Sequence, residues 1–211
     1  MSQPVTARAP LVAAQVFGAR LDLAGRYADL LSTDGIARGL LGPREADVVW
    51  ERHLLNCAVV GELIPVGASV LDVGSGAGLP GLPLALARPD LRVTLLEPLE
   101  RRVRFLGEVV DALALSDQVT VARGRAEERP VPPADVVTAR AVAPLPRLAG
   151  WTAPLVATGG AVLALRGARA AEELREAATE LARAKLVADV QVCGGTLLDV
   201  PTTVVRLRRS T

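Results

Sequence analysis

The hydrophobic pattern of the chain changes near residue 68. From there on, short and nearly continuous apolar runs alternate with longer stretches of helical periodicity. Runs of this kind are typical of parallel strands whose two faces are both covered. We predict strands over Ala68–Val73, Arg92–Glu97, Gln118–Ala122, Ala134–Ala139 and Ala161–Leu165, with two more near Ala188–Cys193 and Thr202–Leu207.

Helical patterns separate most of these runs. The clearest lies between residues 99 and 115, where Leu99, Val103, Leu106, Val110 and Leu113 recur at helical spacing. We predict helices over Leu79–Ala87, Leu99–Leu115, Leu145–Leu155 and Ala168–Val187.

Residues 1–65 have a different, helical character. Two amphipathic segments are predicted, Phe17–Leu31 and Pro43–Leu63, and Pro43 suits the first turn of a helix. Gly61 and Pro65 mark the exit from the second segment. We therefore divide the chain into an N-terminal helical extension (1–65) and a main domain (66–211).

Repeated strand–helix units predict an α/β fold: a seven-stranded, mostly parallel, Rossmann-like sheet with helices on both faces. The last two strands are joined only by residues 194–201. A parallel crossover needs a longer connection, so we expect the last strand to be antiparallel to the others.

Composition adds few constraints. The chain has 211 residues and a net charge of +1, which neither indicates nor excludes an RNA partner. Cys57 and Cys193 lie far apart without a CxxC pattern, which argues against a zinc site or a disulfide framework and fits a reducing cytoplasm. We expect no signal peptide and no membrane span, because neither apolar pattern is present.

The candidate chemistry begins where the first predicted strand ends. Asp72 lies near the end of this strand and is followed by glycines at 74, 76 and 78, and the next strand ends in Glu97. Glycines let the backbone turn sharply and approach a ligand, and the helix that follows offers N-terminal amides. A carboxylate at the end of the second strand can accept hydrogen bonds from a ribose. The sequence therefore predicts a site for NAD, FAD or S-adenosylmethionine.

Two details favour S-adenosylmethionine. Residues 76–81 match GxGxxG, so a dinucleotide is an open alternative, although that pattern alone is weak evidence. The loop lies far from the start of the chain, however, and no second substrate domain follows it. Asp72 also precedes the glycines, where an acid can face the methionine amino group. No GK[ST] follows, so a Walker A loop is excluded.

The loop also resembles the signature of a known family. Residues Asp72–Gly81, and above all Leu79–Ala85, are similar to the ribosomal small-subunit methyltransferase G family, also called glucose-inhibited division protein B. Further segments resemble its motifs in the same order: Glu51–Cys57, Leu96–Leu106, Gly124–Glu128 and Val137–Ala143. The resemblance covers most of residues 40–170.

This resemblance implies a class I S-adenosylmethionine-dependent methyltransferase. The family methylates N7 of guanine 527, in the 530 loop of 16S rRNA, so the implied partner is 16S rRNA or the 30S subunit. The resemblance also implies a cytoplasmic monomer. The implied cofactor-binding residues, together with the loop acid and glycines, are Asp72, Gly74, Gly76, Gly78, Leu79, Glu97, Ala126, Glu127 and Arg140.

This chain departs from the family pattern at four positions. Asn56 and Cys57 replace the usual Asp-Ser, Pro98 replaces a Ser, and Arg101 stands where Lys is common. We expect the cofactor pocket to tolerate these changes.

Guanine N7 carries a lone pair and no proton, so its methylation needs no general base. Catalysis can consist mainly of alignment, and Arg140 is the one catalytic candidate. Candidate RNA contacts are His53, Arg101, Arg102, Arg104 and Arg125, with a buried core histidine and solvated arginines as the alternatives. The rival functions are a small-molecule methyltransferase, an NAD(P)-dependent oxidoreductase and a non-catalytic RNA-binding module.

Overall fold

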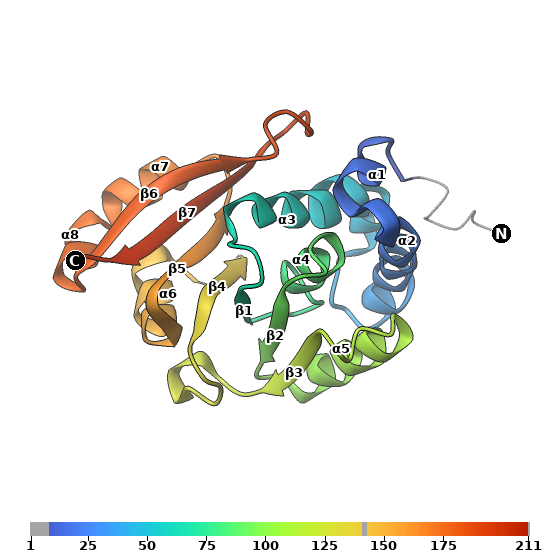
Figure 1. The fold of residues 1–211 in the computed structure, drawn as a ribbon, viewed down its shortest axis with the longest axis horizontal. Coiled ribbons are helices and arrows are strands. Elements are labelled where there is room, and N and C mark those ends of the chain that lie inside the picture. Colours follow the sequence, from blue (N-terminus) through green and yellow to red (C-terminus); the bar gives the residue numbers. More distant parts are fainter. Residues whose placement is uncertain (1–8, 141–142, 211) are drawn as a thin grey trace.

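A computed structural model describes residues 9–140 and 143–210 (Figure 1). Its centre is one seven-stranded sheet in the order β3-β2-β1-β4-β5-β7-β6. The strands are β1 Ser69–Val73, β2 Arg92–Glu97, β3 Val119–Arg123, β4 Ala134–Arg140, β5 Val156–Arg166, β6 Leu186–Cys193 and β7 Thr202–Arg209. The first five strands are parallel, and β7 pairs antiparallel with both β5 and β6. The predicted fold class and the antiparallel last strand are thus confirmed.

Most helices of the main domain lie where the sequence predicts them. They are α4 Gly81–Ala87, α5 Glu100–Ala112, α6 Leu145–Thr152, α7 Ala170–Glu176 and α8 Ala178–Arg183. One predicted helix, Ala168–Val187, is in fact two helices that meet at Ala177, and β6 already begins at Leu186. Within the described residues, no helix is long and apolar enough to cross a membrane.

The N-terminal segment is helical but interrupted. It consists of α1 Val12–Phe17, a 3₁₀ turn Gly18–Arg20, α2 Leu21–Leu30, a wide turn Leu31–Gly35, and a second run with α3 Asn56–Ala58 inside it. This second run begins at Pro43 and ends at Leu63, as predicted. The first predicted segment, Phe17–Leu31, is a 3₁₀ turn followed by α2. The sequence did not predict α1, which ends at Phe17 because Gly18, with a φ of 50°, stops the helix.

Side chains alternate between two cores, one on each face of the sheet. Val70, Val93, Val136 and Leu163 pack against the N-terminal segment, α4 and α5. Their neighbours along the strands, such as Leu71, Val137 and Val162, pack against α6, α7 and α8. Because side chains alternate with a period of two, Asp72, Thr138 and Arg140 all belong to the face that the N-terminal segment covers.

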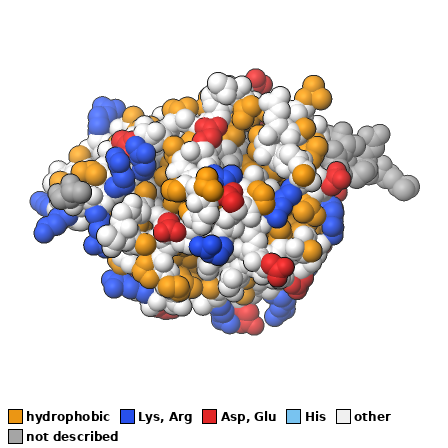
Figure 2. Space-filling view, in the orientation of Figure 1, with side chains coloured by type: hydrophobic (Ala, Val, Ile, Leu, Met, Phe, Trp, Pro, Cys, Tyr) orange, Lys and Arg blue, Asp and Glu red, His pale blue; other side chains and the backbone are white. Residues whose placement is uncertain are grey.

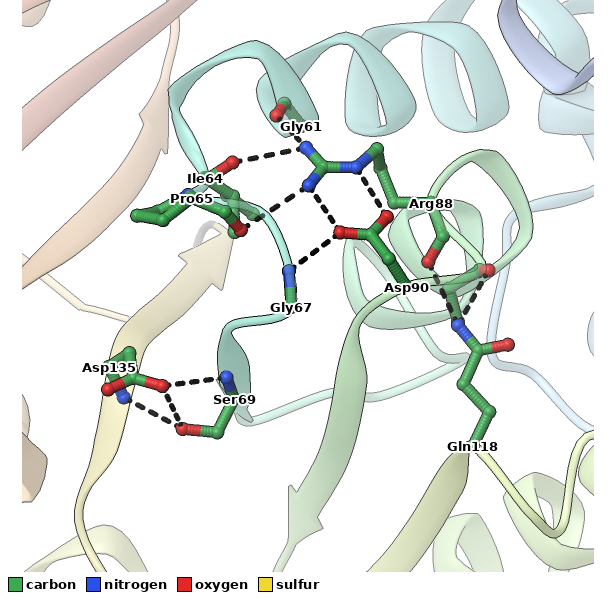
Figure 3. A network of polar contacts seen from close by, with 10 residues as sticks. Gly61, Ile64, Pro65, Gly67, Ser69, Arg88, Asp90, Gln118 and Asp135 are labelled. Atoms are coloured by element: carbon green, nitrogen blue, oxygen red, sulfur yellow. Dashed lines mark hydrogen bonds and ion pairs between the residues drawn. The ribbon is translucent and has the colours of Figure 1, made fainter.

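A polar network joins the end of the N-terminal segment to the connection between α4 and β2 (Figure 3). Arg88, just after α4, donates to three carbonyl oxygens there: Gly61 (2.7 Å), Ile64 (3.1 Å) and Pro65 (3.3 Å). Arg88 also binds Asp90, which accepts a 2.8 Å hydrogen bond from the Gly67 backbone N–H. The end of the helical segment is therefore held against the connection between α4 and β2, while the domain division at residue 65 stays a prediction.

Charges on the face drawn in Figure 2 are mixed, with several basic side chains toward the C-terminal end of the molecule. At that end, the C-terminal arginines are partly neutralised. Arg206 forms a 2.7 Å ion pair with Asp189, and Arg208 lies 3.6 Å from the same carboxylate. Exposed pairs of this kind contribute little to stability, but they reduce the local positive charge.

Candidate functional site

The site lies at the carboxyl ends of β1, β2 and β4. Strand order reverses between β1 and β4, and open α/β sheets bind ligands in the crevice outside such a reversal. A cavity of about 480 Å³ opens there. Its walls come from the glycine loop, the end of β2, the N-terminal segment, the start of α5, the turn after β3 and the end of β4. The lining residues are Leu40, Leu41, Gly74, Ser75, Gly76, Ala77, Leu79, Glu97, Pro98, Leu99, Arg102, Arg125 and Arg140.

The glycine loop has the close packing that the sequence suggests. Gly78 has a φ of 101°, and a Cβ there would collide with the Leu82 side chain and lie 3.0 Å from the Tyr27 hydroxyl oxygen. That hydroxyl donates a 2.9 Å hydrogen bond to the carbonyl oxygen of Ala77. A side chain at this position would therefore push α4 and the N-terminal segment away from the loop.

Asp72 is fully buried beneath the loop. One carboxylate oxygen accepts the backbone N–H of Gly81 (3.1 Å), and the other accepts the hydroxyl of Thr138 (3.1 Å). Burial raises the pKa of Asp72 to about 6, although these hydrogen bonds oppose the shift. Asp72 thus holds the start of α4 to β1 and β4, and it does not line the cavity described above; a direct contact with a cofactor stays a prediction.

Glu97 ends β2 and lies in the cavity wall. Its carboxylate accepts backbone N–H groups from Gly76 (3.0 Å) and Leu99 (3.0 Å). An ionised carboxylate offers about four acceptor positions, so two remain for other donors such as ribose hydroxyls. The side chain is 1% exposed, and Arg102 lies 3.8 Å away.

The basic cluster on α5 separates into two parts. Arg102 lines the cavity, and its buried Nε has no hydrogen-bond partner among the residues that the structure describes. Arg101 and Arg104 are exposed, and Arg104 lies 3.7 Å from Glu100 one turn away. The structure therefore brings Arg102 to the cavity and leaves Arg101 and Arg104 on the surface, because one turn of helix points neighbouring residues in different directions.

The turn after β3 contributes Arg125 to the cavity wall. Ala126 and Glu127 follow it on a short 3₁₀ turn, with Ala126 buried and Glu127 exposed. Ala126 and Glu127 therefore follow a wall residue in the sequence but do not themselves line the cavity.

Arg140 and His53 meet at the end of β4. The guanidinium NH1 donates to His53 Nδ1 (2.9 Å), and His53 Nε2 lies 2.6 Å from a carboxylate oxygen of Glu45. His53 is buried, so its neighbours are protein groups. Burial, followed by the charge of Arg140, lowers the pKa of His53, while Glu45 opposes this shift. Ala141 and Val142, part of the motif at 137–143, lie outside the described residues.

Several wall residues could not be found from motifs. Leu40 and Leu41 come from the N-terminal segment, and Tyr27 supports the loop from the same part of the chain. Arg102, in contrast, was a candidate from the sequence, and it occupies the first turn of the helix after Glu97. Among the described residues, no cluster of histidine, cysteine or acidic side chains could hold a metal ion.

Solved structures share this fold. Precorrin-6y C5,15-methyltransferase from Geobacter metallireducens matches with a TM-score of 0.55 and 15% identity, over 85% of this chain and 96% of that chain. Mitomycin 7-O-methyltransferase matches with a TM-score of 0.63 and 22% identity, over 94% of this chain and 65% of that one. The fold is that of class I methyltransferases.

Sequence comparison defines the family. The model of the rRNA small subunit methyltransferase G family matches residues 20–196. The curated protein "Ribosomal RNA small subunit methyltransferase G" of Thermobifida fusca is 60% identical over 94% of this chain and 84% of its own length. Its namesake from Rhodococcus jostii is 58% identical over 93% and 88%. The chain belongs to the rRNA small subunit methyltransferase G family.

Proposed function

We propose that this protein transfers a methyl group from S-adenosylmethionine to N7 of guanine 527, in the 530 loop of 16S rRNA. Membership of the methyltransferase G family supports the reaction. The observation that carries the assignment of the site is the cavity of about 480 Å³ between the glycine loop, Glu97 and Arg140. A protein with this substrate would work in the cytoplasm, and we expect it to act as a monomer.

The residues of the cavity fit the cofactor. Glu97 retains acceptor positions for the ribose hydroxyls, and the backbone at Gly74 and Gly76 can approach the ligand without a Cβ between them. Glu97 would hold the ribose hydroxyls, and Arg140 is a further candidate contact for the cofactor. S-adenosylmethionine supplies an electrophilic methyl group on a positively charged sulfur.

The chain needs to supply position rather than a base. Guanine N7 has a free lone pair, so no proton has to leave before the methyl group is transferred. Holding two reactants in line contributes as much as roughly 7–11 kcal/mol to lowering a barrier. Near Arg140 the only histidine, His53, has both ring nitrogens engaged, which agrees with a site that aligns its substrates without acid–base catalysis.

Methyl transfer to 16S rRNA tests this proposal. The purified protein, radiolabelled S-adenosylmethionine and 30S subunits or naked 16S rRNA from cells without this modification are incubated, and the labelled base is mapped. We expect one labelled guanine, in the 530 loop. Label at another atom or in another loop would contradict the proposal, as would label on a small molecule alone.

Thermal unfolding separates the rival cofactors. We expect S-adenosylhomocysteine to raise the melting temperature, since a ligand that binds only the folded state stabilises it. NAD(P) should leave the melting temperature unchanged. Stabilisation by NAD(P) alone would favour the oxidoreductase, and binding of rRNA without methyl transfer would favour the RNA-binding module.

A further inference from the structure

Arg140 belongs to two cavities at once. It lines the cofactor cavity and also a neighbouring cavity of about 510 Å³. The N-terminal segment supplies one wall of this second cavity, with Glu45, His53 and Cys57, and the end of β5 supplies the opposite wall, with Arg166. The orientation of the Arg140 guanidinium therefore affects both spaces.

Two side chains of the N-terminal segment hold one nitrogen of Arg140. Its NH1 donates to His53 Nδ1 at 2.9 Å and approaches the Cys57 sulfur at 3.9 Å. A guanidinium has donors only, so Nδ1 must present its lone pair. The ring proton then lies on Nε2, which is 2.6 Å from the Glu45 carboxylate. Glu45 thereby selects the one tautomer of His53 that can accept from Arg140.

The surroundings favour an uncharged His53. The charged groups that face it are Glu45, Arg52 on its own segment and Arg140 from β4. Burial and Arg140 lower the pKa of His53, and Glu45 opposes them. The charge of Arg140 also lowers the pKa of Cys57 and of Asp72, against the effect of their burial. Burial still raises the pKa of the Cys57 thiol to about 11, so this thiol is uncharged at neutral pH.

We propose that His53, oriented by Glu45, is a positioning residue for Arg140 and sets the direction of its guanidinium between the cofactor cavity and the neighbouring cavity. This inference rests on the proposed function. It also gives the N-terminal segment a defined part in the site. Direct contact of His53 with RNA is not part of this proposal, because the ring is buried and both nitrogens already have partners.

Binding of S-adenosylhomocysteine, measured by calorimetry without RNA, tests the proposal. Loss of a hydrogen bond to a charged group corresponds to about ten-fold in affinity or more, so His53→Ala should weaken binding about ten-fold. His53→Asn keeps an acceptor at the place of Nδ1 and should restore most of the affinity. The control is Arg52→Gln, which removes the exposed ion-pair partner of Glu45 (3.2 Å) and should change little.

A double-mutant cycle excludes a merely structural role. If His53 acts through Arg140, His53→Ala should have no further effect on affinity in an Arg140→Ala background. Thermal unfolding of each variant shows that it is folded. Equal effects of His53→Ala with and without Arg140 would overturn the proposal.

The pH dependence gives a second readout. Protonated His53 cannot accept from Arg140 and adds a positive charge beside it, so the affinity of the wild type should fall as His53 protonates, below its ordinary pKa of 6.5. Asp72 titrates in the same range, with a pKa of about 6. His53→Asn retains Asp72. If the affinity of this variant still falls at low pH as in the wild type, the role of His53 is overturned; if the fall disappears, the role is supported.

The two proposals fail in different ways. If the wild type binds S-adenosylhomocysteine with the expected coupling but does not methylate 16S rRNA, the proposed function is wrong and the positioning of Arg140 stands. If the wild type methylates the 530 loop and His53→Ala binds the ligand normally, only the positioning inference is wrong.

Discussion

Two groups of side chains on the same face of the sheet hold the site in different ways. Asp72 and Thr138 form a closed cluster with the Gly81 backbone, completely buried and internally satisfied. Glu45, His53 and Arg140 form a second chain of contacts that ends at two cavities. The first cluster holds the start of α4 against the sheet, and the second orients a guanidinium that lines both cavities.

The difference predicts different consequences of mutation. A change in the closed cluster must displace packed atoms or leave a buried group without a partner, so its main effect is on stability. A change in the Glu45–His53–Arg140 chain removes an orienting contact next to open space, so its main effect is on binding. Each prediction below can confirm or break this division.

Replacement of Gly81 should have the largest effect. A Cβ there would collide with the Leu95 side chain and lie 2.9 Å from a carboxylate oxygen of Asp72. Because both neighbours are fully buried, we expect Gly81→Ala to lower the free energy of unfolding by about 3 kcal/mol, at the upper end for overpacking. Urea denaturation measures this.

The matched control is Gly107→Ala, in the helix α5, where no atom lies within 4 Å of the new Cβ. This substitution should stabilise the protein by about 0.4–1 kcal/mol, because it restricts the unfolded chain. If Gly81→Ala were as harmless as this control, the closed packing of the loop would be refuted.

The charge of Asp72 should make stability depend on pH. Burial raises its pKa from 3.8 to about 6, so the folded state keeps a proton that the unfolded state has lost between these values. Wild-type stability therefore falls, relative to Asp72→Asn, as the pH rises through this range. We expect a change on the order of 2 kcal/mol between about pH 4 and pH 7, at about 1.4 kcal/mol per pKa unit.

The comparison with Asp72→Asn isolates this residue, since all other titrating groups are common to both proteins. Asparagine can still accept from Gly81 with its oxygen and donate to Thr138 with its nitrogen. A stability difference that is independent of pH would show that folding does not raise the pKa of Asp72.

The sequence predicts the local features of the site better than the contacts between distant parts of the chain. Contiguous patterns succeed: β2 has the predicted bounds, and the glycine loop and Glu97 lie together at the cavity. The contact between Gly81 and Asp72 spans nine residues, whereas His53 and Arg140 are 87 residues apart. No periodicity predicts that second contact, because it depends on how the N-terminal segment packs on the sheet.

Two element boundaries were not predicted, the start of β5 and the end of α1. The strand β5 begins at Val156, five residues before the predicted start, because Gly159 and Gly160 lie in an exposed stretch with a register shift opposite Ala134. A segment that contains two adjacent glycines lacks the apolar pattern of a buried strand. The end of α1 before Gly18 was also not predicted. Among the described residues, no atom lies within 4 Å of a Cβ built at Gly18, so this glycine is not required by close packing.

Tyr27 links the N-terminal segment to the glycine loop, and its replacement should have an intermediate effect on stability. Its buried hydroxyl donates to Ala77 O at 2.9 Å, which links α2 to the glycine loop. We expect Tyr27→Phe to lower the free energy of unfolding by about 1 kcal/mol, because the ring is kept and one buried hydrogen bond is lost. Urea denaturation checks this, and an unchanged stability would mean that water replaces the hydroxyl.

Cys57 should show the smallest effect, although it also contacts Arg140. Its sulfur lies 3.9 Å from NH1, and sulfur is a weak acceptor, whereas the His53 nitrogen lies at 2.9 Å. We expect Cys57→Ala to change the affinity for S-adenosylhomocysteine by less than about two-fold, compared with about ten-fold for His53→Ala. Calorimetry of both variants under the same conditions measures the ratio. Equal losses would mean that Arg140 is held by the general packing of the N-terminal segment rather than by the imidazole, and the contrast between the closed loop and the oriented arginine would no longer hold.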